Sequence, residues 1–158
     1  MPRAVDDLDR LARVLEQSRD PENPPPDRVA EILRDTRKIA VVGLSRDPAK
    51  AARRVPSYLA AKGYDVIPVN PNAERILGKK ALDRLSDVEE EVDMVLVFRP
   101  SDEAGSVVRD AADRPERPVI WLQEGIRNDP AAREARERGL TVVQDLCSFK
   151  ARRALGLG

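Results

Sequence analysis

The sequence predicts an α/β fold: one doubly wound domain with a parallel sheet of about five strands and helices on both faces. Short apolar runs rich in β-branched residues alternate with amphipathic helical patterns about five times along the chain. Such alternation implies parallel strands joined by right-handed crossovers. The length of 158 residues suits a single domain with a hydrophobic core of its own.

The N-terminal part is expected to be a helical extension of this domain. Residues 5–18 place apolar side chains three and four positions apart, which predicts an amphipathic helix. The sequence RDPENPPPD at 19–27 predicts a linker, because proline breaks helices. A second short helix follows, with Asp27 as its expected N-cap. We therefore expect a helix and linker over residues 1–26 and the α/β domain over residues 27–158.

Within the domain, the buried strands are predicted from continuous apolar runs, which suit a sheet covered on both faces. These runs lie at residues 38–43, 64–70, 93–98, 118–122 and 140–144. Helices are predicted at residues 49–63, 101–113 and 129–139, and a further short element is expected around residues 79–85. Gly63 is a natural C-cap for the first of these helices, and Pro56 places the start of its regular part near that proline.

Composition limits the classes of function. Hydrophobic residues make up 41% and charged residues 35% of the chain, which is typical of a globular protein in water. The 28 basic and 28 acidic side chains cancel, which argues against a nucleic-acid or membrane-surface partner. The charged N-terminus does not resemble a signal peptide, and the single cysteine allows no intrachain disulfide. A cytoplasmic location is therefore expected.

The chain contains no histidine, so a histidine base, metal ligand or phosphohistidine is excluded. With one cysteine as well, a structural zinc site lacks ligands, and we expect no metal site.

Ligands of an open parallel sheet bind outside the carboxyl ends of its strands. After the first strand, Gly43 allows a tight turn, Ser45 adds a hydroxyl, and helix amides favour an anion. Four cations follow at once, namely Arg46, Lys50, Arg53 and Arg54. They predict a phosphate site, the alternative being that these arginines and the lysine are solvated surface residues.

The glycine pattern of this turn disfavours NAD. The dinucleotide fingerprint places glycines where this chain has Ser45 and Pro48, and it needs an acidic residue where the second strand ends in PVNPN. A P-loop is excluded because no G-K-[ST] motif is present.

Four blocks of sequence together resemble a known family. The segments beginning IAVVGLSRDP, VDMVLVFRPSDE, VIWLQEGIRN and GLTVVQDLC occur in order, and the last three, like VGLS and PVNP in the first, lie at or beside strand ends. Over roughly residues 28–150 the chain resembles the small bacterial CoA-binding proteins. These are single Rossmann-type domains similar to the CoA-binding domain of the succinyl-CoA synthetase α subunit.

The resemblance implies CoA or an acyl-CoA as the ligand and assigns residues to its parts. The pyrophosphate would lie on Gly43, Leu44 and Ser45, and the ribose 3′-phosphate would take its cations from Arg46, Lys50, Arg53 and Arg54. The adenosine would be flanked by Val69, Asn70 and Pro71. The pantetheine arm would pass Phe98, Arg99, Pro100, Gln123, Glu124, Gly125 and Ile126.

The expected function is a CoA-binding protein without catalysis of its own, because ligase relatives use further domains and a phosphohistidine that this chain lacks. One alternative is a small enzyme that handles acyl-CoA or NAD(P). Another is a protein-interaction or regulatory domain with a vestigial nucleotide site. The N-terminal helix either packs on the domain or forms a homodimer or another protein contact.

A few further residues have two interpretations. Trp121 is expected in the core. Cys147 is either a small apolar residue or a thiol able to form a mixed disulfide with CoA. Glu124 and Asp145 are either structural carboxylates or, if buried, general bases. The segment that contains Lys150 departs from the family pattern, so no role is assigned to that lysine.

Overall fold

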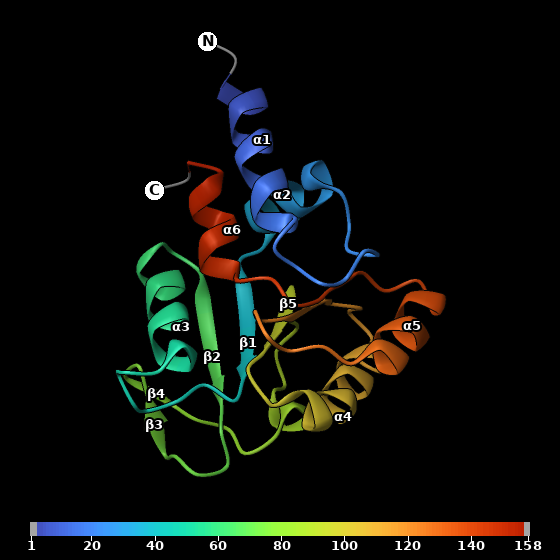
Figure 1. Cartoon of the computed structure of the whole chain (residues 1–158). Helices are drawn as coiled ribbons and strands as arrows, with labels where there is room; N and C mark the ends of the chain where they lie inside the picture. Colours follow the sequence, from blue (N-terminus) through green and yellow to red (C-terminus); the bar gives the residue numbers. More distant parts are fainter. Residues whose placement is uncertain (1–2, 157–158) are drawn as a thin grey trace.

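The central feature is a five-stranded parallel sheet, shown in Figure 1 as part of a computed structural model that describes residues 3–156. In spatial order its strands are β2 (Asp65–Val69), β1 (Lys38–Val42), β5 (Met94–Val97), β6 (Val119–Leu122) and β7 (Val142–Val143). All neighbours pair in parallel, with Ile39 opposite Val66 on one side and Met94 on the other. The predicted fold class is therefore confirmed.

Helices cover both faces of the sheet, as a doubly wound fold requires. One face is covered by α2 (Pro26–Asp35), α3 (Ala51–Ala61) and α6 (Ser148–Ala154), and α1 (Arg3–Leu15) packs on α2 and α6. The other is covered by α4 (Ser101–Ala112), α5 (Asp129–Glu137) and the 3₁₀ turn η1 (Leu85–Asp87). Between residues 3 and 156, no helix is both long and apolar enough to cross a bilayer.

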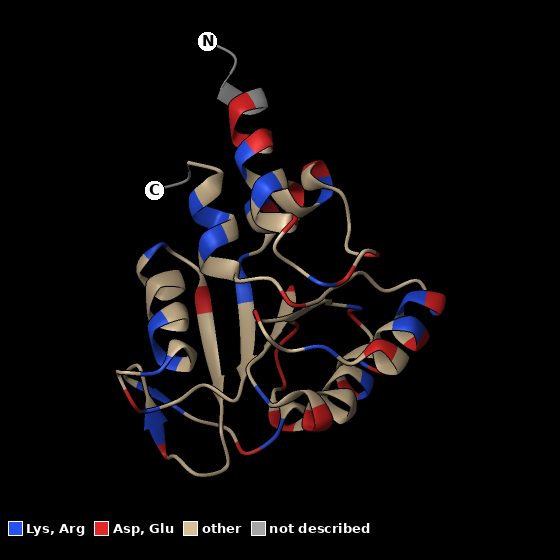
Figure 2. Cartoon of the chain, viewed as in Figure 1, with Lys and Arg blue, Asp and Glu red and all other residues tan. Residues whose placement is uncertain are grey.

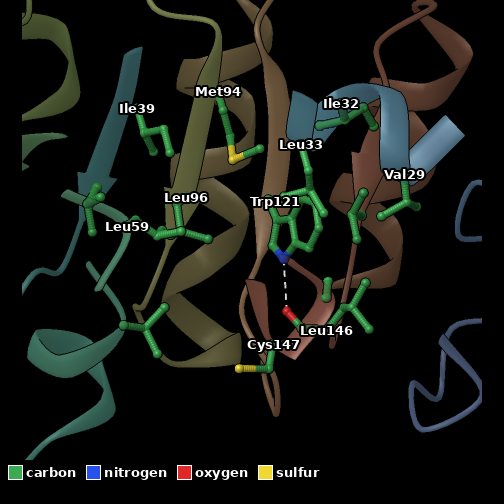
Figure 3. Packing of buried hydrophobic residues seen from close by; sticks show 14 of the residues in the cluster. Val29, Ile32, Leu33, Ile39, Leu59, Met94, Leu96, Trp121, Leu146 and Cys147 are labelled. Atoms are coloured by element: carbon green, nitrogen blue, oxygen red, sulfur yellow. Dashed lines mark hydrogen bonds between the residues drawn. The ribbon is translucent and has the colours of Figure 1, made fainter. Parts of the chain in front are cut away.

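Trp121 forms the centre of the core on the α2 side of the sheet (Figure 3). Its side chain is fully buried, as expected, and its indole Nε1–H donates to the carbonyl of Leu146 at 2.8 Å. This bond satisfies the one polar group of a large buried ring. It also fixes the chain just before Cys147, which lies beside the tryptophan at the start of α6.

The N-terminal helix α1 packs against α2 and α6 at one end of the molecule (Figure 1). Leu11 is fully buried in the same core cluster as Trp121. Of the two expectations for this helix, packing on the domain is observed. The boundary between residues 26 and 27 stays a prediction. Helix α6 was not predicted from the sequence.

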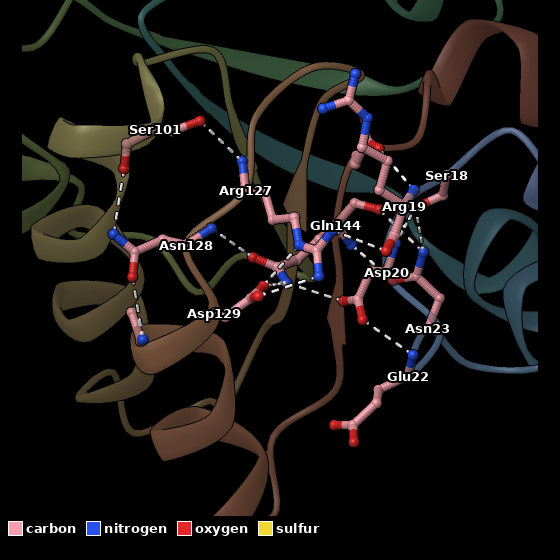
Figure 4. A network of polar contacts seen from close by, with 12 residues as sticks. Ser18, Arg19, Asp20, Glu22, Asn23, Ser101, Arg127, Asn128, Asp129 and Gln144 are labelled. Carbon is pink, nitrogen blue, oxygen red and sulfur yellow. Dashed lines mark hydrogen bonds and ion pairs between the residues drawn. The ribbon is translucent and has the colours of Figure 1, made fainter.

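The proline-rich segment after α1 is held against the edge strand β7 (Figure 4). The Asn23 side chain pairs with both backbone groups of Gln144, accepting from its N–H at 2.8 Å and donating to its carbonyl at 2.9 Å. The Asp20 carboxylate accepts from the Gln144 side chain at 2.8 Å and from Arg136 at 3.0 Å. These contacts bind the backbone of Gln144, the residue after β7, and so protect the end of an edge strand from pairing with another chain.

Two helix starts differ from the prediction. Helix α2 begins at Pro26, one residue before Asp27, which lies in the first turn and caps nothing with its side chain. The N–H of the first helical residue has no acceptor within the helix. Proline, which lacks this N–H, therefore suits the first position. Helix α3 begins at Ala51, which leaves Pro56 inside the helix.

Around the element expected at residues 79–85, the structure has η1 and a hairpin of β3 (Arg75–Ile76) and β4 (Lys79–Lys80).

Candidate functional site

The strand order places the candidate site between β1 and its two neighbours. Strands β2 and β5 flank β1, and the chain reaches them by crossovers in opposite directions. The carboxyl end of the sheet at such a switch point is where ligands of open α/β folds bind. The loops that leave β1, β2 and β5 meet there.

The turn after β1 is built around Gly43, whose φ is +92°. Its N–H donates to the carbonyl of Val69 at 2.9 Å, which joins the ends of β1 and β2. A Cβ on this residue would lie 3.1 Å from Arg99 Cδ and 3.3 Å from the carbonyl carbon of Phe98. Both the backbone angle and the close approach therefore require glycine.

The rest of this turn is anchored on helix α3 and on β2. The Ser45 N–H donates to the carbonyl of Ala52 at 3.0 Å. That carbonyl is free because Pro56, four residues later, has no N–H to donate to it. The Asn70 side chain donates to the carbonyl of Leu44 at 2.9 Å. The turn is thus fixed by its neighbours before any ligand arrives.

The backbone amides of the turn divide into two sets. Those of Gly43 and Ser45 donate inward, so they are not available to a phosphate. Those of Leu44 and Arg46 have no acceptor among residues 3–156. The sequence predicted a cradle made by Gly43, Leu44 and Ser45. Of these three residues only Leu44 has an N–H without an acceptor in the described part of the chain, but Leu44 is fully buried, so the predicted three-residue cradle does not face the surface in this form.

A cavity of about 560 Å³ opens beside this turn. It lies between α3 and the start of α6, over the ends of β5 and β6, and most of its lining is apolar. Its lining residues are Ala51, Arg54, Val55, Tyr58, Phe98, Gln123, Glu124, Ile126, Cys147, Phe149 and Lys150. The rings of Tyr58 and Phe149 meet edge to face with centroids 4.5 Å apart, which joins the α3 wall to the α6 wall.

Gln123 and Glu124 have partners in the cavity, whereas the buried hydroxyl of Tyr58 has none among residues 3–156. Gln123 accepts from the Ser148 N–H at 3.2 Å and from its hydroxyl at 3.0 Å. Glu124 forms an ion pair with Lys150 at 3.2 Å, and both side chains are about half exposed. The burial that a general base at Glu124 would need is not observed here. Cys147 is buried, with 7% of its surface exposed.

A second, more open hollow lies on the other side of the turn, beyond the end of β2. Its volume is about 1050 Å³. It contains Pro71 and Asn72 from the loop after β2, together with Arg46, Arg75 and Lys80. We call it the outer groove. Its lining also holds the carboxylates Glu74 and Asp83, so it is charged with a small excess of cations, unlike the apolar cavity.

The four cations predicted after β1 separate in space. Arg54 lines the apolar cavity and Arg46 lines the outer groove, whereas Lys50 and Arg53 line neither. Within residues 3–156, none of these side chains forms an ion pair with a carboxylate. The buried Nε of Arg53 also has no hydrogen-bond acceptor there. The turn therefore carries positive charge that no described side chain neutralises.

Other predicted site residues support the site without facing a hollow. Val69 and the Leu44 side chain are buried in the core. Arg99 lies behind Gly43 and pairs with Glu103 at 2.7 Å, and Pro100 precedes the first residue of α4. The Gly125 N–H donates to Asp145 at 2.7 Å, and the Arg19 N–H donates to the same carboxylate at 2.8 Å. Asp145 is therefore a structural carboxylate that joins three loops.

Two walls of the apolar cavity were missed by reasoning from the sequence. One is the face of α3 formed by Val55 and Tyr58, and the other is the start of α6, with Phe149 and Lys150. The α6 residues follow the last strand, so a rule based on strand ends could have found them. The described part of the chain holds no cluster of three or more potential metal ligands.

Comparisons with known proteins identify the family of the chain. Residues 37–152 match a protein family described as "CoA binding domain". The chain is 37% identical over 126 residues to the uncharacterized protein YneT of Bacillus subtilis, which covers 80% of this chain and 93% of that protein. It is 27% identical over 95 residues to an ADP-forming acetate–CoA ligase of Archaeoglobus fulgidus, but that match spans only 14% of the ligase.

Solved structures show the same fold. A hypothetical protein from Pyrococcus horikoshii has a TM-score of 0.82 and 32% identity, over 89% of this chain and 98% of that one. A Thermus thermophilus protein has a TM-score of 0.76 and 35% identity, over 82% and 97%. A dinucleotide-forming acetyl-coenzyme A synthetase of Ca. Korarchaeum cryptofilum has a TM-score of 0.58 and 26% identity, over 68% of this chain and 25% of that one. On this evidence, the chain belongs to the CoA-binding domain family.

Proposed function

We propose that this protein binds CoA or an acyl-CoA across the turn after β1 and holds it without chemical change. The ADP part would lie on the turn and in the outer groove, and the pantetheine arm would enter the apolar cavity. The observation that carries the proposal is the turn itself. It has cations that form no ion pair among residues 3–156 and the unbonded, exposed amide of Arg46, and it stands between a charged groove with an excess of cations and an apolar cavity.

The ADP part matches the polar side of the turn. The N–H of the exposed Arg46, which has no acceptor among residues 3–156, would donate to a pyrophosphate oxygen. Pro71 offers an apolar surface for the adenine in the outer groove. Arg46 lines that same groove, so among the four predicted cations it is the one placed to bind a ribose 3′-phosphate beside the adenosine. NAD lacks that phosphate, so Arg46 would favour CoA over NAD.

The pantetheine arm matches the apolar side. Val55, Phe98 and Ile126 provide aliphatic and aromatic surface, and Arg54 lines the wall of the cavity that α3 forms. A volume of about 560 Å³ lies within the roughly 300–1,000 Å³ range of small-molecule sites. A flexible thiol-ended chain would bury its methylene groups here and bring its sulfur into the cavity that contains Cys147.

The arrangement of polar groups favours binding over catalysis. Nucleophilic catalysis needs a base within hydrogen-bond reach of the nucleophile. In the part of the chain that the structure describes, no hydrogen bond links Cys147 to a titratable side chain. Gln123 is bonded to Ser148, and Glu124 is paired with Lys150 at the exposed rim. A protein of this kind would store CoA, sense it or present it to a partner.

The experiment is calorimetric titration of the purified chain with CoA, acetyl-CoA, dephospho-CoA, NAD and NADPH at one salt concentration. We expect CoA and acetyl-CoA to bind with micromolar or tighter affinity while NAD gives no signal. Tighter binding of NADPH than of CoA would instead favour an NADP-linked enzyme. If none of the five ligands binds, the turn has only a structural role in the fold.

A further inference from the structure

A separate cavity of about 210 Å³ lies at the amino end of the sheet, opposite the CoA site. It is formed where α2 leads into β1, where α3 leads into β2, and where α6 passes over both. Its charged lining residues are Arg34, Arg37, Lys62 and Arg152, and none of its lining residues is acidic. We call it the amino-edge pocket. Figure 2 shows lysine and arginine positions at the end of α3 and along α6.

Arg152 is the unusual member of this set. Only 9% of its surface is exposed. Its Nε–H donates to the Tyr64 hydroxyl at 3.3 Å, and its guanidinium carbon lies 5.4 Å from the centre of the Tyr64 ring. Its buried Nη1 has no hydrogen-bond acceptor among residues 3–156, and no carboxylate there lies within 4 Å of the group.

A guanidinium in this position lacks a counter-charge. Arginine stays protonated in proteins, and a buried charge is costly unless an opposite charge and hydrogen bonds compensate it. Burial lowers the pKa of the Arg152 guanidinium, but the nearby hydroxyls of Tyr58 and Tyr64 raise this pKa by more. These hydroxyls and stacking on Tyr64 offset part of the cost of burial but supply no negative charge at neutral pH. The carboxylate of Asp65 follows directly in the chain, but it is bound by Lys79 at 2.6 Å and lies 3.8 Å from Lys38. It does not pair with Arg152.

The other three cations are exposed and have a second explanation. Arg34 is in the last turn of α2 and Lys62 follows α3, where positive charge stabilises the negative end of a helix. Arg37 donates to the Arg34 carbonyl at 3.0 Å. These roles leave the positive charges in place around the pocket. They do not explain why Arg152 is buried beside them without an anion.

We propose that the amino-edge pocket binds a small oxyanion of the phosphate class, either inorganic phosphate or the phosphate of a small phosphomonoester. The tetrahedral dianion would accept from Arg152 at the base of the pocket and from Lys62 and Arg37 at its mouth. A volume of about 210 Å³ is below the roughly 300 Å³ at which drug-sized sites begin, so the ligand is small. This site is distinct from the proposed CoA site, and neither depends on the other.

The test must separate phosphate bound here from phosphate bound at the turn after β1. The starting protein is therefore the double variant Arg46→Gln and Arg54→Gln, which removes the two turn cations that line the outer groove and the apolar cavity. We would titrate it by calorimetry with sodium phosphate and with glycerol 3-phosphate, at constant ionic strength set with chloride. Saturable one-site binding is expected. Tighter binding of glycerol 3-phosphate would identify a phosphomonoester, and tighter binding of phosphate would identify the free ion.

Two further variants locate the site. In the same background, Arg152→Gln should weaken phosphate binding by about tenfold or more, because it removes a charged donor. The matched control is Arg153→Gln, which removes an exposed arginine from the same helix and should change binding less than about twofold. If Arg152→Gln fails to fold, the surface double variant Arg37→Gln and Lys62→Gln replaces it, with the same expected loss. Absence of saturable binding, or equal affinity with and without the pocket cations, would overturn the proposal.

Discussion

The Ser45 N–H donates to the carbonyl of Ala52 at 3.0 Å, and Pro56 leaves that carbonyl free. A proline inside a helix thus has a function in the turn that precedes the helix. The helix loses one internal bond, and the loop gains an anchor between the candidate phosphate donors and α3.

Replacing Pro56 with alanine tests this relationship. The new N–H would compete with Ser45 for the Ala52 carbonyl, so the turn would loosen while the helix gains a bond. We expect CoA affinity to fall by about 1 kcal/mol, roughly fivefold, without loss of thermal stability. Ser57→Ala, at the next position of α3, is the control in the same titration. A variant with unchanged affinity would show that the bond does not matter for binding.

Substitution of Gly43 should be destabilising for two separable reasons. Alanine at φ +92° is strained by about 1–2 kcal/mol, and its Cβ would also contact the Phe98 backbone at 3.3 Å. Gly63 has φ +102° but open space around it, so Gly63→Ala has only the first cost. Urea unfolding should therefore rank Gly43→Ala as the less stable variant. Equal losses would mean that the close approach to Phe98 costs nothing.

The Asp20 carboxylate gives a prediction on pH. Burial alone would raise the pKa of the Asp20 carboxyl. The hydrogen bond from Gln144 and the charge of Arg136 together lower this pKa by more than burial raises it, so the net pKa lies below the ordinary 3.8. The ionised group therefore stabilises the fold above about pH 3.8, and this contribution is lost as the pH falls through the lower folded-state pKa. We expect Asp20→Asn to cost about 3 kcal/mol at neutral pH, because it breaks a buried ion pair.

Chemical denaturation of both proteins between pH 7 and pH 2 measures this effect. The stability difference between wild type and Asp20→Asn should narrow at the acidic end. Glu22→Gln is the control, since its mostly exposed carboxylate lies 3.9 Å from the same arginine. A difference that is constant across the whole range would contradict the role of the Asp20 charge.

Much of the fold was predictable from the sequence because buried strands carry continuous apolar runs. The runs at 38–43 and 93–98 gave β1 and β5 almost at their observed limits. Helix α6 was missed because its short sequence SFKARRA has no clear apolar period, and tertiary packing on α1 and α3 stabilises it. The docked linker was missed because side chains such as Asn23, rather than a backbone pattern, hold it on β7.

The candidate site was predictable at the level of strand ends and less so at the level of single atoms. Phe98, Gln123, Glu124 and Ile126 do meet in one cavity. No pattern in the sequence shows that the Ser45 amide would be used internally, or that Arg46 and Arg54 would face different hollows. Those facts depend on how Pro56 and the loop before α3 direct the backbone.

Cys147 is a built-in reporter for the apolar cavity, because it is the only cysteine in the chain. If the pantetheine arm fills the cavity, bound CoA should protect the thiol from iodoacetamide. The alkylation rate, followed by mass spectrometry, should fall by about tenfold at CoA concentrations near 10 Kd. NAD at the same concentration is the control and should give no protection. An alkylation rate unaffected by saturating CoA would place the arm elsewhere.

The most direct test of the proposed binding mode compares CoA with dephospho-CoA, which lacks only the ribose 3′-phosphate. Both would be titrated into wild type, Arg46→Ala, Arg54→Ala and the control Arg133→Ala, whose arginine is on α5. We predict that wild type and the control prefer CoA by about tenfold or more, as one charged contact allows. Arg46→Ala should lose most of that preference, whereas Arg54→Ala should weaken both ligands equally. A wild-type protein that binds neither ligand, or binds both with the same affinity, would contradict the account.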